Sequence, residues 1–116
     1  MAAGTYNMII EQGTDITRTF TYTDDAGVAF NLAGYTARMQ GRASIQSTAT
    51  IFDLTTANGG LSIPTPANGT IVMTMTSAQT SAYPCDGVYD LEIIDSSGKV
   101  TRLVEGQFTL SGEVTR

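Results

Sequence analysis

Short segments in which apolar and polar residues alternate are the feature that most constrains how this chain can fold. In residues 86–110, apolar residues such as Leu91 alternate with acidic ones such as Glu92, and the sequence DSSG at 95–98 interrupts the alternation. Because successive side chains of a strand point to opposite faces, the pattern predicts two half-buried strands joined by a type I turn with a glycine bulge. We therefore expect a long β-hairpin in this stretch.

The same pattern recurs along the rest of the chain. Other extended segments, separated by Gly, Asn, Asp and Pro, lie at 6–12, 15–23, 35–40, 50–55 and 70–76. Arg18 interrupts the apolar side of its segment and is expected at the rim of a sheet. One short helical turn, capped by Ser77, is expected to cross between the two sheets, after the segment 70–76 and before the hairpin.

These segments together predict the fold class. About seven strands with frequent turns favour an all-β fold, an immunoglobulin-like antiparallel β-sandwich of about seven to nine strands. With 116 residues the chain fits a single domain, 1–116. Within such a fold, Gly87-Val88-Tyr89 resembles the Gly-x-Tyr part of the tyrosine corner that opens a strand of immunoglobulin domains.

The composition excludes several kinds of catalytic site. The chain contains no histidine, so Ser-His-Asp and Cys-His catalysis lack their base and the commonest metal ligand is missing. A hydroxyl nucleophile would need Lys99 as its base, and Lys99 is expected in a turn. Asp90 and Glu92 are expected on a solvated face and match no calcium-binding loop. We therefore expect no catalytic residue, no cofactor and no metal site.

The charge and hydropathy limit the partners. Six basic and eleven acidic residues give a net charge of −5, and the basic residues are scattered, so nucleic-acid binding is not expected. No apolar run approaches the roughly 20 residues that cross a bilayer, and the first residues do not resemble a signal peptide. We therefore expect a soluble protein made in the cytoplasm. Cys85 is the single cysteine, which excludes an internal disulfide.

Candidate contacts with a partner come from segments that fit no regular strand. The stretch 43–50 is small and polar around one apolar residue, so we expect a mobile loop or an irregular edge strand there. Tyr83, beside Pro84, is the one tyrosine expected at the surface. The predicted contact residues are Ser44, Ile45, Gln46, Tyr83, Arg102 and Arg116.

Several motifs resemble those of small virion proteins of tailed bacteriophages, and the likeness covers nearly the whole chain. They are QGT at 12–14, NLAGYTARMQGR at 31–42, TSAQT at 76–80, YDLE at 89–92 and GKVTRLVEG at 98–106. The pattern is also similar to the immunoglobulin-like N-terminal domain of phage baseplate upper proteins. The resemblance implies a structural role in the virion, after synthesis in the bacterial host cytoplasm.

What the resemblance implies is a non-enzymatic adaptor in the tail, baseplate or tail-fibre assembly. Such a protein would be present in several copies and would bury a strand edge or a sheet face against other phage virion proteins. Two alternatives stay open. One is a capsid decoration (cement) protein bound to the major capsid protein, and the other is a carbohydrate-binding module with Tyr83 in its sugar platform.

Overall fold

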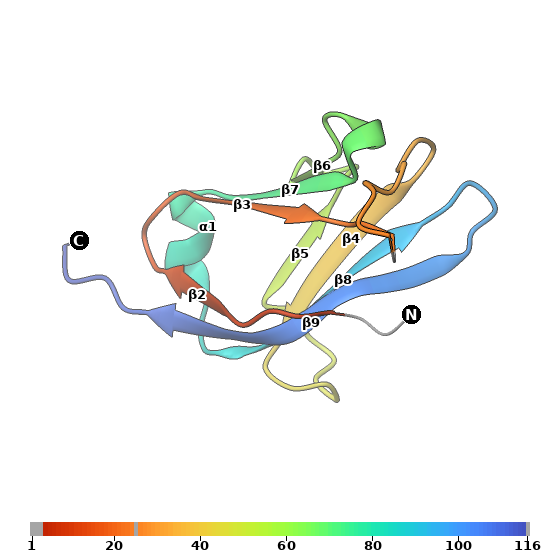
Figure 1. Cartoon of the computed structure of the whole chain (residues 1–116). Coiled ribbons are helices and arrows are strands. Elements are labelled where there is room, and N and C mark those ends of the chain that lie inside the picture. Colours follow the sequence, from red (N-terminus) through yellow and green to blue (C-terminus); the bar gives the residue numbers. More distant parts are fainter. Residues whose placement is uncertain (1–3, 25, 116) are drawn as a thin grey trace.

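A computed structural model of the chain describes residues 4–24 and 26–115 and contains two layers of β-sheet (Figure 1). The strands are β1 (Gly4–Thr5), β2 (Met8–Glu11), β3 (Ile16–Thr21), β4 (Thr36–Arg42), β5 (Phe52–Thr55), β6 (Leu61–Ser62), β7 (Thr70–Met75), β8 (Gly87–Ile94) and β9 (Val100–Ser111). A 3-10 helix η1 (Pro66–Asn68) and a short helix α1 (Ser77–Ala82) lie on either side of β7 in the sequence. The prediction of an all-β sandwich is confirmed.

The strand order explains the two layers. One sheet has the order β1-β9-β8-β4-β5, with β2 also beside β9, and the other has the order β3-β7-β6. The smaller sheet corresponds to strands B, E and D of an immunoglobulin domain, and β9-β8-β4-β5 corresponds to G, F, C and C′. The connections between β3 and β4 and between β7 and β8 therefore pass from one layer to the other.

One part of the predicted strand pairing was wrong. The sandwich is not antiparallel throughout, because β1 and β2 both run parallel to β9, with Gly4 opposite Val104 and Met8 opposite Phe108. The reason lies in the crossing that follows β2. The chain turns at 12–15 into the other layer, so no hairpin joins β2 to β9, and no tight turn fixes the relative direction of these two strands.

The core lies between the two sheets and is made of the inward-facing half of each alternating segment. Met39 on β4 and Leu91 on β8 lie opposite each other and are fully buried. Phe52 packs against Phe108, with ring centroids 5.2 Å apart. Burial of such side chains is the main stabilising contribution to a fold that has no disulfide.

The hairpin of β8 and β9 has the predicted turn. The amide of Gly98 donates to the carbonyl of Asp95 at 3.0 Å, and the amide of Asp95 donates to the carbonyl of Lys99 at 3.0 Å. Gly98 has φ 91°, a left-handed conformation that glycine adopts without strain. The register also shifts between Leu91 and Glu92, a β-bulge that alternation alone did not predict.

The helix α1 begins one residue earlier than predicted. Its N-cap is Thr76, not Ser77, and Thr76 forms a capping box with Gln79. The Thr80 hydroxyl is buried: it accepts from the amide of Gly13 and donates to the carbonyl of Thr14. This pair of bonds fixes α1 to the turn that joins the two layers after β2.

Candidate functional site

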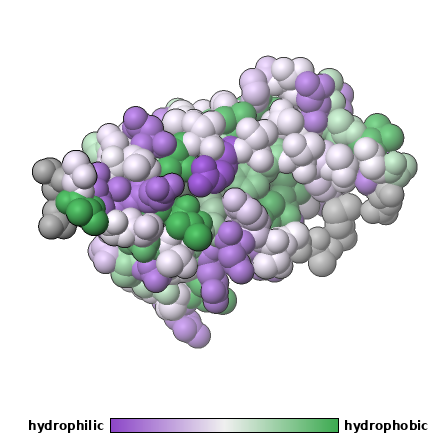
Figure 2. Space-filling view, turned by 60° about the vertical axis from the view of Figure 1, so that its left-hand side comes forward, coloured by the Kyte–Doolittle hydropathy of each residue, from purple (hydrophilic) through white to green (hydrophobic). Residues whose placement is uncertain are grey.

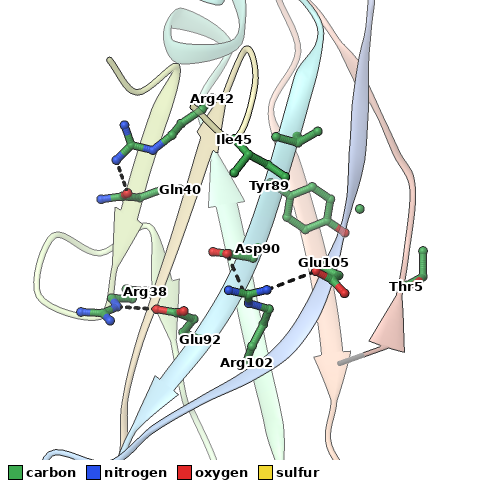
Figure 3. A pocket seen from close by; sticks show the side chains of 12 residues that line it. Thr5, Arg38, Gln40, Arg42, Ile45, Tyr89, Asp90, Glu92, Arg102 and Glu105 are labelled. Carbon is green, nitrogen blue, oxygen red and sulfur yellow. Dashed lines mark hydrogen bonds and ion pairs between the residues drawn. The ribbon is translucent and has the colours of Figure 1, made fainter. Parts of the chain in front are cut away.

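A shallow hollow lies on the outer face of the larger sheet, where β4, β8 and β9 run side by side (Figure 3). Its volume is about 630 Å³. Alternation sets its lining, since the residues that do not face the core must face outward. We call this surface the outer face, and its charged and amide side chains are Arg38, Gln40, Arg42, Asp90, Glu92, Arg102 and Glu105.

Ion pairs join charged side chains of neighbouring strands on the outer face (Figure 3). The Arg38 Nε atom lies 2.8 Å from Glu92 Oε1. Arg102 lies between two carboxylates, 3.5 Å from Asp90 and 3.3 Å from Glu105. Asp90 and Glu105 lie directly opposite each other on β8 and β9, and like charges in that position repel. Arg102 therefore offsets a repulsion that the register creates.

The surroundings of Asp90 still disfavour the charged form of its carboxyl. Partial burial raises the pKa of the Asp90 carboxyl above its usual value, and the neighbouring carboxylate of Glu92 raises it further. The guanidinium of Arg102 acts in the opposite direction, but the other effects are larger. Arg102 therefore compensates the charge of Asp90 only in part.

The loop at 43–50 borders the outer face, and the prediction of a loop there is confirmed because residues 43–51 form no strand. Arg42 holds this loop. Its guanidinium donates to the carbonyls of Ser47 and Thr48 at 3.0 Å and 2.8 Å, and to Gln40 Oε1 at 2.9 Å. Within the loop the hydroxyls of Ser44 and Ser47 lie 3.1 Å apart. The loop is therefore ordered by specific bonds although it has no regular structure.

Ile45 projects from this ordered loop. Its side chain is 85% exposed and lies at the border of the hollow (Figure 3). A large aliphatic side chain in water gains free energy when a partner buries it. On the face of the molecule in Figure 2, hydrophobic side chains are interspersed with hydrophilic ones. Ile45 is thus an exposed apolar contact next to a charged surface.

The structure places most of the predicted contact residues on or beside the outer face. Ser44, Ile45 and Gln46 are exposed in the 43–50 loop, and Arg102 is about half-exposed on the outer face. Structure thus brings the loop and Arg102 to one surface. Arg116 lies outside the described residues.

The prediction for Tyr83 was wrong, because Tyr83 is buried, with 7% of its surface exposed. The helix α1 ends at Ala82, and the extended residue that follows turns its ring into the core, 5.6 Å from the ring of Phe52. Among the described residues its hydroxyl has no hydrogen-bond partner, and burial raises its pKa. A proline after a tyrosine indicated an exposed turn, but the core contact lies more than thirty residues away in sequence and left no local sign.

Tyr89 has a different role from the one its motif suggested. In the tyrosine corner the hydroxyl bonds to backbone a few residues upstream. Here the Tyr89 hydroxyl donates to the carbonyl of Tyr6, between β1 and β2. Gly106 lies opposite Tyr89 on β9, and a Cβ atom at Gly106 would lie 2.2 Å from that carbonyl oxygen. Gly106, in the middle of an alternating strand, was the one sequence signal of this close approach.

Among the described residues, Lys99 is not paired with the nearby Ser97 hydroxyl as a base. The Ser97 hydroxyl donates to Asp95 Oδ1 at 2.7 Å instead of to Lys99. No three His, Cys, Asp or Glu side chains among the described residues are grouped so that they could hold a metal ion. In the same part of the chain, no helix has the length and apolar character needed to cross a membrane. The chemistry that the outer face supports is ion pairing, hydrogen bonding and apolar contact.

No known protein family matches the chain, and no curated protein shows significant similarity to it.

Proposed function

We propose that this protein is a non-enzymatic structural component of a tailed-phage virion, an adaptor in the tail, baseplate or tail-fibre assembly. Its partners are other virion proteins, and several copies are present in each particle. The motifs at 31–42 and 98–106, which resemble those of phage virion proteins, support the virion context. In this proposal the sandwich acts as a rigid body that presents a binding surface.

One observation carries the proposal of a contact role: the 43–50 loop, held by Arg42, presents Ile45 beside the hollow of the outer face. Interfaces commonly contain a few apolar anchors surrounded by polar groups whose hydrogen bonds are satisfied. Because the loop is already ordered, little conformational entropy is lost when a partner buries Ile45. The ion pairs around the hollow would then set the orientation of the partner.

The test is electron microscopy, at side-chain resolution, of intact particles of a phage that encodes this chain. We expect the protein in the tail, with Ile45 and Arg102 in contact with a neighbouring subunit. Particles assembled with the Ile45→Ser variant should then contain much less of the protein. The matched control is Val28→Ser, which removes another exposed apolar side chain at a different place. Full incorporation of Ile45→Ser would contradict the proposed contact.

The same images decide between the proposed role and its first alternative. A decoration protein would cover repeated sites on the head and would be missing from isolated tails. The carbohydrate-binding alternative depended on Tyr83 as a sugar platform, and that side chain is in the core. Density for this chain on heads alone would replace the adaptor with a capsid decoration protein.

A further inference from the structure

The strand β3 forms one edge of the smaller sheet (Figure 1). It pairs with β7 over its whole length, from Ile16 opposite Met75 to Thr21 opposite Thr70. In the part of the chain that the structure describes, no strand pairs with its other edge. Such an edge is a template for the addition of a strand from another chain.

The hydrogen bond that follows β3 shows which main-chain groups are at this edge. The amide of Tyr22 donates to the carbonyl of Gly69, on the β7 side, at 2.8 Å. In an antiparallel pair, the N–H and C=O groups of alternate residues point to the same side, so Phe20 and Arg18 also direct theirs toward β7. The groups directed away from β7 therefore belong to Thr17, Thr19 and Thr21.

Arg18 partly covers this edge. It lies in the inward-facing row of β3 between Ile16 and Phe20, and its guanidinium donates to the edge carbonyl of Thr17 at 3.2 Å. An inward-pointing charge on an edge strand is a known device against unselective pairing. Arg18 forms no ion pair with any of the described residues, in contrast to Arg38 and Arg102. Its positive charge is thus available to a partner.

We infer that the free edge of β3 binds an extended segment of another protein, which adds a fourth strand to the smaller sheet and places an acidic side chain against Arg18. The main-chain groups of Thr17, Thr19 and Thr21 supply the hydrogen bonds, whatever the sequence of the partner. To accept a strand, Arg18 must release the carbonyl of Thr17. A partner carboxylate offsets the loss of that bond, and a basic side chain does not, so the edge is selective.

A second copy of this chain fits the edge less well than an acidic segment does. If two β3 strands paired about Thr19, each Arg18 would lie opposite Phe20 of the other copy. The two guanidinium groups would then be diagonal neighbours on the inward side, where like charges repel. The unpaired charge of Arg18 therefore favours a different protein with a negatively charged extended segment.

This inference rests on one part of the proposed function, namely that the chain acts through contacts with other proteins. It concerns a different surface, however, because β3 belongs to the smaller sheet and the outer face to the larger one. An experiment with a defined probe strand tests the edge without any virion. Its result is independent of where the protein is found in a particle.

The probe is a short strand of alternating Thr and Val residues with Glu, Gln or Lys at its centre. It is joined to the chain by a flexible Gly-Ser linker, which raises its effective concentration. The measurement is hydrogen exchange at the amides of Thr17, Thr19 and Thr21 by NMR. We expect the Glu probe to slow exchange at these amides, with about tenfold more protection than the Lys probe. Equal protection by the two probes, or none by the Glu probe, would overturn the inference.

Two variants separate charge recognition from main-chain pairing. Arg18→Glu should reverse the order, so that the Lys probe protects more than the Glu probe. Thr19→Pro removes an edge N–H that β7 does not use and should abolish protection, whereas the control Thr19→Ala keeps the N–H and should retain it. If circular dichroism shows that Thr19→Pro is unfolded, the Arg18→Glu reversal alone decides. An unchanged order of probes with Arg18→Glu would contradict the role of the charge.

Discussion

The two sides of β8 perform different tasks with the same backbone. On the inner side, Leu91 and Ile93 are buried in the core. On the outer side, Asp90 and Glu92 pair with arginines of neighbouring strands and remain partly exposed. Burial on the inner side contributes most of the stability, while exposed ion pairs contribute little. The outer side can therefore vary to suit a partner without unfolding the domain.

The largest difference between the two sides is expected from a truncation in the core. Leu91→Ala removes buried methyl groups and leaves a cavity between the sheets, so the free energy of unfolding should fall by about 2–5 kcal/mol. Chemical denaturation followed by circular dichroism measures this change. A loss below about 1 kcal/mol would mean that the inner side of β8 is less well packed than its burial indicates.

A smaller effect is expected from removing the buried hydroxyl of Tyr89, on the inner side of β8. Tyr89→Phe removes the hydroxyl that donates to the carbonyl of Tyr6, and we expect a loss of about 1–2 kcal/mol in the free energy of unfolding. Tyr83→Phe is the matched control, because the Tyr83 hydroxyl is buried without a partner among the described residues. That variant should be as stable as the wild type or more stable. Equal losses in the two variants would show that the Tyr89 bond is not the cause.

On the outer side, breaking an ion pair should change stability only slightly. Arg38→Met keeps much of the side-chain length but removes the pair with Glu92, so we expect a loss of about 0.2–1 kcal/mol that decreases with added salt. Thermal unfolding at low and high ionic strength is the appropriate measurement. A loss as large as that of Leu91→Ala would remove the distinction between the two sides.

The smallest effect is a dependence on pH. Because the pKa of Asp90 is raised in the folded protein, its ionisation destabilises the fold at neutral pH, and this effect is relieved as the pH falls through the raised pKa. Asp90→Asn should therefore be slightly more stable than the wild type at neutral pH, and its advantage should shrink in acid. Denaturation curves across the acidic range measure this difference.

Asp95 provides the control of opposite sign. A hydrogen bond from the Ser97 hydroxyl and another from the Lys99 amide lower the pKa of the Asp95 carboxyl. Its charged form therefore stabilises the fold above its ordinary pKa, and this stabilisation is lost as the pH falls through the lowered pKa. Asp95→Asn should thus be less stable than the wild type at neutral pH. If both variants changed stability in the same direction, the assigned causes would be wrong.

Sequence patterns predicted the features that depend on near neighbours. The alternation in 86–110 predicted the hairpin, and the DSSG segment predicted its turn, because side-chain direction and turn geometry follow from a few adjacent residues. The loop at 43–50 was predicted by its composition in the same way. The hydrogen bonds that order this loop come from Arg42, which precedes it on β4, and no sequence pattern indicated them.

Features that depend on distant neighbours were missed. Tyr83 was expected at the surface, but a ring from β5 lies in position to cover it. The parallel pairing of β1 and β2 with β9 joins segments about a hundred residues apart, and no local pattern specifies which edge such a strand will choose. The bond of Tyr89 to Tyr6 is another contact of this kind.

By itself, the sequence determined that this protein is built from strands and which side of most strands is buried, because alternation acts within each segment. Only the tertiary structure decided which strands lie side by side and which edge is left without a neighbour. It therefore also decided that Arg102 meets Asp90 and Glu105 while Arg18 has no carboxylate among the described residues. Pairing between strands depends on the packing of the whole domain, and no single segment carries that information.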